Sequence, residues 1–305
     1  MQVLIVLISI IVILMICSFV ETKLLTVTSY EIGSENIPDD LDGKRIVLLS
    51  DLHNTEFGKN NGILLRKISE TRPDIIIIAG DLINGNTSKK QFVYASEFFK
   101  ELKELNVPVY YSFGNHECRL KGYFYNDSDF KDYVKLSGGG SILLNNASVS
   151  VGRDDNDTAG QTVEKPSDSR QDKKRTRIYG LMLPPSQFKR KAKLKLEKKI
   201  SDQLGDIDKD SYNILIAHDP AYFEDYMEWG ADLVVSGHIH GGIIRIPFLG
   251  GLISPRFEFF PKIDKGLFRY NDGRIMIVSG GIGWHGLPFR FLNRPEIVVL
   301  DMKKI

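Results

Sequence analysis

Five short motifs of aspartate, asparagine, histidine and glycine are the parts of this sequence best suited to chemistry. In chain order they are Asp51-Leu52-His53, Gly80-Asp81, Gly114-Asn115-His116, His218-Asp219 and Gly237-His238-Ile239-His240. Carboxylates and imidazoles together are ligands that Zn²⁺, Mn²⁺ and iron accept. The residue types therefore predict a site for divalent metal ions.

The spacing within two of these motifs suits a shared ion. Asp51 and His53 are two residues apart, as are His238 and His240, so in an extended chain both side chains of a pair point the same way. A carboxylate can bridge two ions, which in hydrolytic sites lie roughly 3.5–4 Å apart. A lone histidine is more often structural, but five of the six histidines fall in these motifs, and only His285 does not.

Each motif directly follows a short apolar run that is typical of a buried strand. The five runs are 46–49, 75–79, 107–113, 214–217 and 233–236. Apolar residues recur with a helical period in 62–70 and in 92–105, which lie between the first three runs. Strands that alternate with helices predict parallel βαβ units, and ligands collect at the carboxyl ends of such strands. We therefore expect the five motifs to converge.

Further strands make the predicted fold a mixed one. Alternating side chains from Leu24 to Ile32 predict an edge strand. Later strands are expected at 267–270, 275–278 and 297–300, and Asn271-Asp272-Gly273 joins the first two as a hairpin. The sequence thus predicts a mixed α/β sandwich.

At these residues the sequence resembles the calcineurin-like metallophosphoesterase family, whose pattern is Asp-x-His, Gly-Asp, Gly-Asn-His, a lone His and Gly-His-x-His. All five blocks are present in order, and the likeness covers roughly residues 24 to 301 apart from one insertion. The C-terminal part, with Gly280-Gly281-Ile282-Gly283 and Pro295-Glu296, is similar to a membrane-anchored bacterial branch acting on phosphodiesters and lipid-linked pyrophosphates. The resemblance implies an α/β/β/α sandwich of two mixed sheets flanked by helices.

The resemblance also implies two divalent metal ions, which would be Mn, Zn or Fe. One ion would be held by Asp51, His53, Asp81 and His240, and the second by Asp81, Asn115, His218 and His238. Asp81 would then bridge the two ions. His116 would lie beside them as a catalytic residue.

The implied reaction is hydrolysis of a phosphodiester or pyrophosphate bond by in-line attack of a metal-bridging hydroxide. His116, when protonated, would stabilise the transition state or protonate the leaving oxygen. Asp219 and Glu117 would orient imidazoles, with solvated loop charges as an equal alternative. The branch often has Thr at Ile239 and Gln at Ile243, and because neither is a ligand position, these departures bear on the substrate and not on the metals.

The N-terminus carries an uncharged apolar run from Val3 to Val20. As a helix, its 18 residues reach roughly 27 Å, close to the thickness of a hydrocarbon core. A cleaved signal peptide is the alternative, but no Lys or Arg precedes the run and no A-x-A pattern follows it. We predict a single-pass anchor of the cell membrane at 1–20 and a calcineurin-like phosphoesterase domain at 21–305. The flanking charges favour neither side of the membrane.

Two charged segments stand out within the domain. Among the 26 residues of 152–177 only Ala159 and Val163 are apolar and 13 are charged, which predicts a disordered insertion. Residues 188–200 then carry seven Lys or Arg against one Glu. They fit a solvated basic helix or a surface that contacts anionic lipid.

Candidate substrate contacts follow the last motif. The apolar stretch 248–261 is expected either to pack on the core or to form a wall for an acyl or isoprenoid chain. Arg245, Arg290 and His285 are candidates for binding the phosphate-bearing substrate, and Arg256 lies near them in sequence. The substrate is thus expected to be a phosphoester or pyrophosphate, with a lipid-linked one as a further option.

Composition excludes some other classes of protein. Forty Lys and Arg against 39 Asp and Glu give a net charge of +1, so we predict no specific nucleic-acid partner. Two cysteines rule out a disulfide framework and a four-cysteine zinc site. Two alternatives stay open: a membrane-tethered metal- or lipid-binding module with a degenerate site, and a metal-dependent hydrolase of C–N bonds. Oligomeric state does not follow from the sequence.

Overall fold

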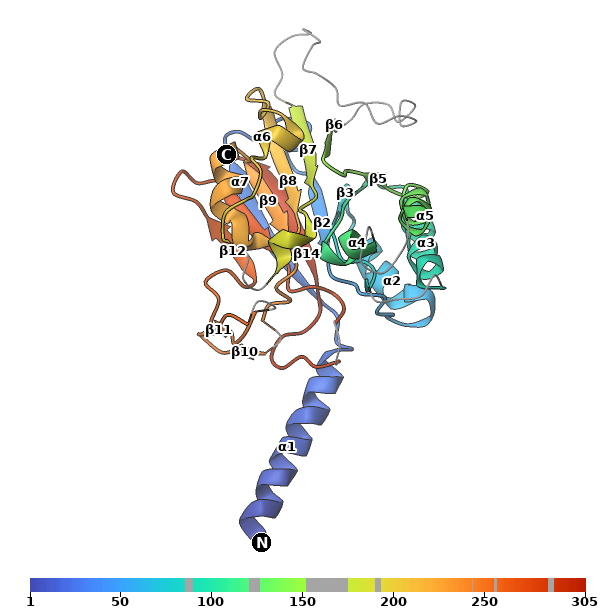
Figure 1. Cartoon of the computed structure of the whole chain (residues 1–305), viewed down its shortest axis with the longest axis vertical. Coiled ribbons are helices and arrows are strands. Elements are labelled where there is room, and N and C mark those ends of the chain that lie inside the picture. The colour runs from blue at the N-terminus through green and yellow to red at the C-terminus, as the bar shows by residue number, and fades with distance from the viewer. Residues whose placement is uncertain are drawn as a thin grey trace.

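The computed structural model describes residues 1–85, 90–120, 127–151, 175–189, 193–242, 244–254, 257–284 and 288–305. Two six-stranded mixed sheets form its centre, helices cover their outer faces, and one long helix projects away from the rest of the chain (Figure 1). The predicted mixed α/β sandwich is confirmed.

The first sheet has the strand order β1-β14-β2-β3-β4-β5. Its strands are β1 (Thr26–Ser34), β14 (Glu296–Lys304), β2 (Arg45–Leu49), β3 (Ile75–Ala79), β4 (Val109–Ser112) and β5 (Ile142–Leu143). All neighbours are parallel except β14 and β2. β1 is an edge strand as predicted, and it pairs along its whole length with β14 from the other end of the chain.

The second sheet has the order β12-β13-β9-β8-β7-β6. Its strands are β12 (Gly266–Arg269), β13 (Ile275–Val278), β9 (Leu233–Ser236), β8 (Ser211–Ala217), β7 (Arg175–Leu181) and β6 (Ala147–Ser150). The predicted hairpin is the antiparallel pair β12–β13, whereas β13, β9, β8 and β7 run parallel. A small separate ribbon pairs β10 (Arg245–Ile246) with β11 (Gly250–Gly251).

The isoleucine run of β3 shows why the two sheets stack. Ile75 and Ile77 lie in an apolar cluster shared with β8 and β9 of the second sheet. Ile76 and Ile78 lie in a separate cluster with the helices outside the first sheet. Successive strand residues point to opposite faces, so a continuous apolar run buries both faces of the sheet at once.

Helices cover the outer face of each sheet. Next to the first sheet lie α2 (Gly62–Glu70), α3 (Lys90–Lys103), α4 (Asn115–Leu120) and α5 (Asp127–Ser137), and α7 (Phe223–Trp229) packs outside the second. The shorter elements are η1 (Lys59–Asn61), η3 (Pro185–Phe188), η4 (Pro220–Tyr222) and α6 (Ser201–Leu204). The two helices predicted from periodicity, α2 and α3, are confirmed.

The projecting helix α1 (Gln2–Glu21) is long and apolar enough to cross a membrane, with a mean hydropathy of 3.4. Ser18 is its one buried residue, and its Oγ accepts a hydrogen bond from the backbone N–H of Arg290 at 2.9 Å. Glu21 accepts a second bond from the backbone N–H of Asn293. The last turn of α1 is therefore attached to the segment that precedes β14.

One predicted boundary and one predicted helix differ from the structure. The charged insertion was placed at 152–177, but 175–177 belong to β7, where Thr176 is buried and its Oγ1 donates to Asp40. The predicted C-terminal end of the insertion is therefore wrong. The composition of 175–177 does not reveal their contact with Asp40, which is distant in sequence. Residues 152–174 lie outside the described residues. In the basic segment, residues 193–199 form no helix.

Candidate metal centre

The five motifs lie at the carboxyl ends of the central strands of both sheets. Asp51 follows β2, Asp81 follows β3 and Asn115 follows β4, all in the first sheet. His218 follows β8, and the His238–His240 motif follows β9, in the second sheet. Because the two sheets are stacked, the motifs from both meet at one buried place.

One group of side chains gathers around Asp51. The Nε2 atoms of His53 and His240 are 3.1 Å apart. Oδ1 of Asp51 lies 3.8 Å from Nε2 of His53 and 3.4 Å from Nε2 of His240. Ligand atoms bound to one Zn²⁺ each lie about 2.0–2.2 Å from it, which leaves them roughly 3–4 Å from one another. The three side chains therefore have the spacing of a shared ion.

A second group gathers around Asp81. Its Oδ2 lies 3.1 Å from Nε2 of His218, and His238 offers a further nitrogen within reach of the same point. The same Oδ2 lies 3.8 Å from Nε2 of His53, which belongs to the first group. Asp81 thus lies between the two groups, where a bridging ligand would be.

The polar atoms of the site fit metal ligation. Oδ1 of Asn115 is buried and has no hydrogen-bond partner among the described residues. The ring of His218 is held by a 2.6 Å contact of Nδ1 with the carbonyl of Ala79, so its Nε2 faces the cluster. A second nitrogen bonded to a backbone carbonyl is the usual way in which proteins orient a metal-binding imidazole.

The backbone at the cluster is strained. Five of the seven predicted ligands have φ between 47° and 69°, namely Asp51, His53, Asp81, His238 and His240. This left-handed conformation costs a non-glycine residue about 1–3 kcal/mol, and it persists where the surroundings impose it, most often at functional sites.

Glycines allow the strand ends to come this close. A Cβ on Gly114 would lie 2.2 Å from Oδ1 of Asp81, and one on Gly237 would lie 2.3 Å from Oδ2 of Asp51. Neither aspartate is free to move away, because each accepts backbone N–H groups, Asp81 from His116 and Asp51 from His238. The glycines in Gly-Asn-His and Gly-His-x-His are thus required by packing.

The carboxylates of Asp51 and Asp81 are both buried, and the charged groups around them change their pKa values. Burial raises the pKa of Asp51 to about 6, His218 opposes this rise, and Asp81 adds to it. Burial acts on Asp81 as well, but the imidazoles of His218 and His116 hold its pKa well below the usual value. Burial and the charge of His53 lower the pKa of His240, which keeps its imidazole in the neutral form that binds metals.

His116 differs from the other histidines in how its ring is held. Its Nδ1 accepts a hydrogen bond from the backbone N–H of Gly85 at 2.8 Å. In the neutral ring the proton is then on Nε2, which lies 3.9 Å from Oδ2 of Asp81. His116 therefore presents an N–H toward the cluster, where it can act as a hydrogen-bond donor.

Glu117 has a role that the sequence reasoning missed. It was expected either to orient an imidazole or to be a solvated loop charge, but it is buried and its carboxylate accepts the backbone N–H groups of Asp81, Ile83 and Gly114. It thereby fixes the loops that carry Asp81 and Asn115. The other expected partner, Asp219, lies with Oδ2 at 3.8 Å from Nε2 of His238 and also caps η4.

The aromatic ring of Phe188 is a second omission from the sequence reasoning. It packs at 5.3 Å from the ring of His238 and at 6.1 Å from that of His218, between centroids. No motif marked this residue, because it comes from η3 and reaches the site only through the tertiary fold.

The three candidate substrate contacts have different surroundings. Arg245 is half-buried and paired with Asp264 at 2.9 Å. Arg290 is buried, and its guanidinium donates to the carbonyls of Gly280, Gly281, Gly283 and Asn293, so it acts on the scaffold. His285 lies outside the described residues, as does Arg256.

Comparison with known proteins agrees with this arrangement. Residues 44–242 match the family described as calcineurin-like phosphoesterase. An uncharacterized metallophosphoesterase of Aquifex aeolicus (strain VF5) is 28% identical over 295 residues, which cover 94% of this chain and 95% of that protein. The uncharacterized metallophosphoesterase YkuE of Bacillus subtilis (strain 168) is 26% identical, over 93% of this chain and 88% of its own length. A Danio rerio transmembrane protein with a metallophosphoesterase domain is 25% identical, over 91% of this chain and 57% of its own length.

A stacked pair of mixed sheets with aspartates and histidines at the strand ends defines a metal-dependent phosphoesterase. The chain belongs to the calcineurin-like phosphoesterase family, and the resemblance noted in its sequence is confirmed. It is a hydrolase of phosphate esters, with candidate ligands for metal at the site described above.

Proposed function

We propose that this protein hydrolyses a phosphodiester or pyrophosphate bond with the help of two divalent ions. Asp51, His53, Asp81 and His240 would hold one ion, and Asp81, Asn115, His218 and His238 the other. The position of Asp81, with one oxygen close to histidines of both groups, is the observation that carries this proposal.

When bound, a pair of divalent ions neutralises charge on the phosphoryl oxygens and makes a nearby water acidic enough to ionise near neutral pH. The chain itself supplies position and a hydrogen-bond donor. Glu117 holds the loops of Asp81 and Asn115 in place, and Ala79 fixes the ring of His218. His116, whose Nε2 carries the proton in the neutral ring, would stabilise the charge on the leaving oxygen with a hydrogen bond, and only the charged ring could protonate that oxygen.

We further propose that α1 is a membrane anchor that remains part of the mature protein. A signal sequence would pass the same test of length and hydropathy, although no Lys or Arg precedes this helix. The buried Ser18 favours an anchor, since cleavage at the end of the helix would remove the acceptor for the N–H of Arg290. The transmembrane relative from Danio rerio supports the same view.

An enzyme anchored in the membrane has ready access to lipid-linked substrates. We propose a lipid-linked substrate on this ground.

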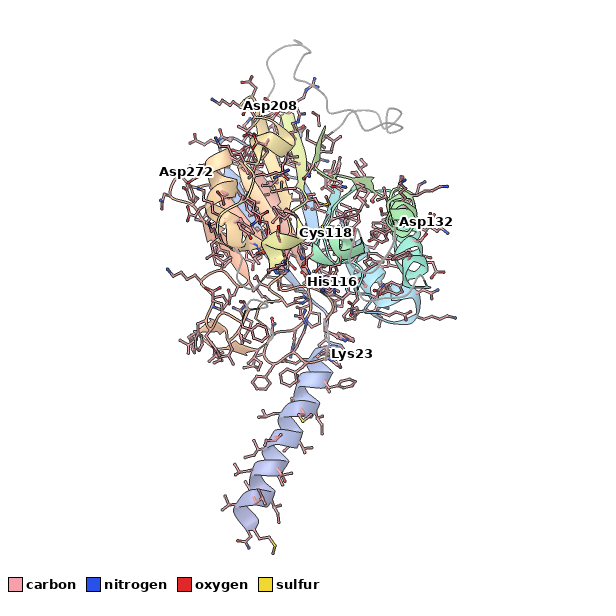
Figure 2. All side chains as sticks on the ribbon, in the orientation of Figure 1. Lys23, His116, Cys118, Asp132, Asp208 and Asp272 are labelled. Carbon is pink, nitrogen blue, oxygen red and sulfur yellow. The ribbon has the colours of Figure 1, made fainter. Side chains whose placement is uncertain are left out.

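The test is a hydrolysis panel with the full-length chain in detergent. Chromogenic phosphomonoesters and phosphodiesters, a nucleotide diester and lipid pyrophosphates are compared with Mn²⁺, Zn²⁺ or Fe²⁺. Asp81→Asn should reduce the rate at least about 100-fold, because even the loss of an outer partner of a ligand costs roughly 10–100-fold. Asp132→Asn, an exposed aspartate on α5, is the matched control and should keep full activity (Figure 2).

Full activity of Asp81→Asn would refute the mechanism. A rate on water-soluble nucleotide diesters far above that on lipid pyrophosphates would refute the lipid-linked substrate while leaving the hydrolase intact. If the wild-type chain bound less than one equivalent of any of these metals and hydrolysed nothing in the panel, the degenerate binding module would be favoured instead.

A further inference from the structure

An exposed apolar surface lies outside the metal centre. We call it the aromatic rim, and it consists of Phe248, Leu249, Phe257, Phe259, Phe260 and Leu292. These side chains are between 46% and 107% exposed, so they contribute little to the core. Of the two alternatives expected for 248–261, packing against the core is therefore not met at these positions.

The rim is an unusual concentration of apolar groups for this chain. On the C-terminal side of α1, only five other large apolar side chains are exposed among the described residues, and they are Leu24, Val27, Ile63, Leu194 and Ile305. Single exposed apolar residues are ordinary, whereas a patch on which Phe248, Leu249, Phe260 and Leu292 line one hollow is typical of a surface that binds something.

Four of the six rim residues have a strained backbone conformation. Phe248, Phe257, Phe260 and Leu292 all have φ between 49° and 68°, in the left-handed region. Bulky residues rarely adopt this conformation. Four such residues within one exposed surface indicate that the loops are shaped to present apolar groups, since core packing gains nothing from them.

The rim lies at the end of the domain from which α1 projects. The backbone N–H of Arg245 donates to the carbonyl of Phe291, which joins the β10–β11 ribbon to the segment holding Leu292. The same segment binds the last turn of α1 through Arg290 and Ser18. Figure 1 shows β10 and β11 at this end, with the chain's C-terminus at the opposite one.

Basic residues surround this end of the molecule. Lys23 follows the last turn of α1, Lys262 follows the rim phenylalanines, and Arg294 follows Leu292; all three are exposed. Glu258 is an exposed carboxylate among them. Apolar side chains bordered by lysine and arginine are the composition of surfaces that lie in the interface of an anionic bilayer.

We propose that the aromatic rim docks onto the lipid bilayer that α1 spans. The rim phenylalanines enter the boundary between headgroups and acyl chains, and Lys23, Lys262 and Arg294 meet anionic headgroups. The domain is then held at two places, by α1 and by the rim, with β10 and the His240 motif on the membrane side. This inference rests on the proposed anchoring by α1 and not on the hydrolytic activity.

The test uses the full-length chain in lipid nanodiscs, whose two faces are both open to solvent. A polarity-sensitive fluorophore is attached to one cysteine at a time: native Cys17 on α1, Phe248→Cys on the rim, or Ile305→Cys at the far end. The last two variants also carry Cys17→Ser. Cys118 is buried, and the Cys17→Ser protein alone gives the labelling blank.

Ile305 is the matched control because it is apolar and 71% exposed, and it follows the nine-residue strand β14. That strand separates it from the α1 junction by roughly 30 Å at about 3.3 Å per residue.

We expect the emission of the Phe248→Cys probe to shift to the blue, and its quenching by aqueous iodide to fall at least about threefold below that of Ile305→Cys. A side chain buried roughly 5–10 Å into the headgroup and acyl boundary is out of reach of an aqueous anion. The Cys17 probe reports the anchor separately, and it should be protected as well.

Three results would overturn the proposal. Protection at Cys17 together with full quenching at Phe248→Cys means that α1 is inserted and the rim is not docked. Full quenching at Cys17 means that the anchoring has failed, whatever the enzyme hydrolyses. Protection at Phe248→Cys that persists in detergent and increases with protein concentration means that the rim binds a second copy of this chain.

Discussion

Replacing Arg290 tests whether this side chain holds the scaffold or binds substrate. Its guanidinium is buried and donates four hydrogen bonds of 2.6–3.2 Å, to the carbonyls of Gly280, Gly281, Gly283 and Asn293. Burial lowers its pKa to about 10, with Asp51, Glu296 and Glu21 opposing the change, so it is a cation at neutral pH.

The expected cost of Arg290→Ala follows from these contacts. Each hydrogen bond to a charged group contributes about 1.5–3 kcal/mol, but the cation's own desolvation offsets much of the sum. Each buried carbonyl left without a donor costs about 1–3 kcal/mol, so after relaxation of some of the four we expect a net loss of about 3–5 kcal/mol. For a domain of this size that corresponds to a fall in Tm of roughly 6–20 °C.

Activity should fall as well, even at temperatures where the variant is folded. Gly281 lies against Asp51 and His240, and Asn293, whose carbonyl Arg290 binds, donates to the carbonyl of His240. Loss of the guanidinium therefore loosens two candidate ligands, and metal affinity should drop together with kcat. Arg290→Lys keeps the charge, but an ammonium group cannot reach all four carbonyls as the planar guanidinium does. It should therefore recover only part of the Tm and part of the metal affinity.

Calorimetry, metal titration and steady-state kinetics on the three proteins decide the matter. A variant Arg290→Ala with the wild-type Tm and wild-type metal affinity, and with only KM raised, would show that Arg290 contacts substrate. That outcome would refute the scaffold role argued here.

Four further outcomes are expected. His116→Gln should lower kcat by about 10²–10⁴-fold with metal content unchanged in elemental analysis, because it removes the imidazole that acts on the leaving oxygen and no ligand; loss of metal would make His116 a ligand instead. Gly114→Ala should abolish metal binding, since its Cβ would lie 2.2 Å from Oδ1 of Asp81, whereas Gly138→Ala, with its nearest contact at 3.4 Å, should bind metal normally in the same titration. Chelation should stop hydrolysis and one of Mn²⁺, Zn²⁺ or Fe²⁺ should restore it; unchanged activity in the chelator would contradict the metal mechanism. Ser18→Ala should lower the free energy of unfolding by about 1 kcal/mol, the worth of one hydrogen bond, with no change if the junction is not formed.

The central strands and the metal motifs could be predicted because their signals are local. The run Ile75–Ala79 is apolar without interruption, and Gly80-Asp81 follows it at once, so both the strand and its functional end are visible in a few residues. Parallel strands then bring such ends together by topology alone.

What could not be predicted depends on contacts between distant parts of the chain. The pairing of β1 with β14 joins the two ends of the sequence. The start of β7 at Arg175 depends on Asp40, and the inward position of Arg290 depends on four carbonyls that sequence does not mark. Glu117 shows the same limit, because a carboxylate beside a histidine does not reveal that its partners are backbone amides.

The attachment of α1 also has a mechanical consequence. Its last turn is fixed to the segment 290–293 by Ser18 and Glu21, so no flexible linker separates the helix from the domain. A membrane helix tilts when the hydrocarbon thickness and its own length do not match. If α1 is the anchor proposed above, a tilt of the helix in a bilayer of different thickness would be transmitted through this joint to the domain and to the segment that supports His240. Bilayer thickness would then set the reach of the catalytic centre above the lipid headgroups.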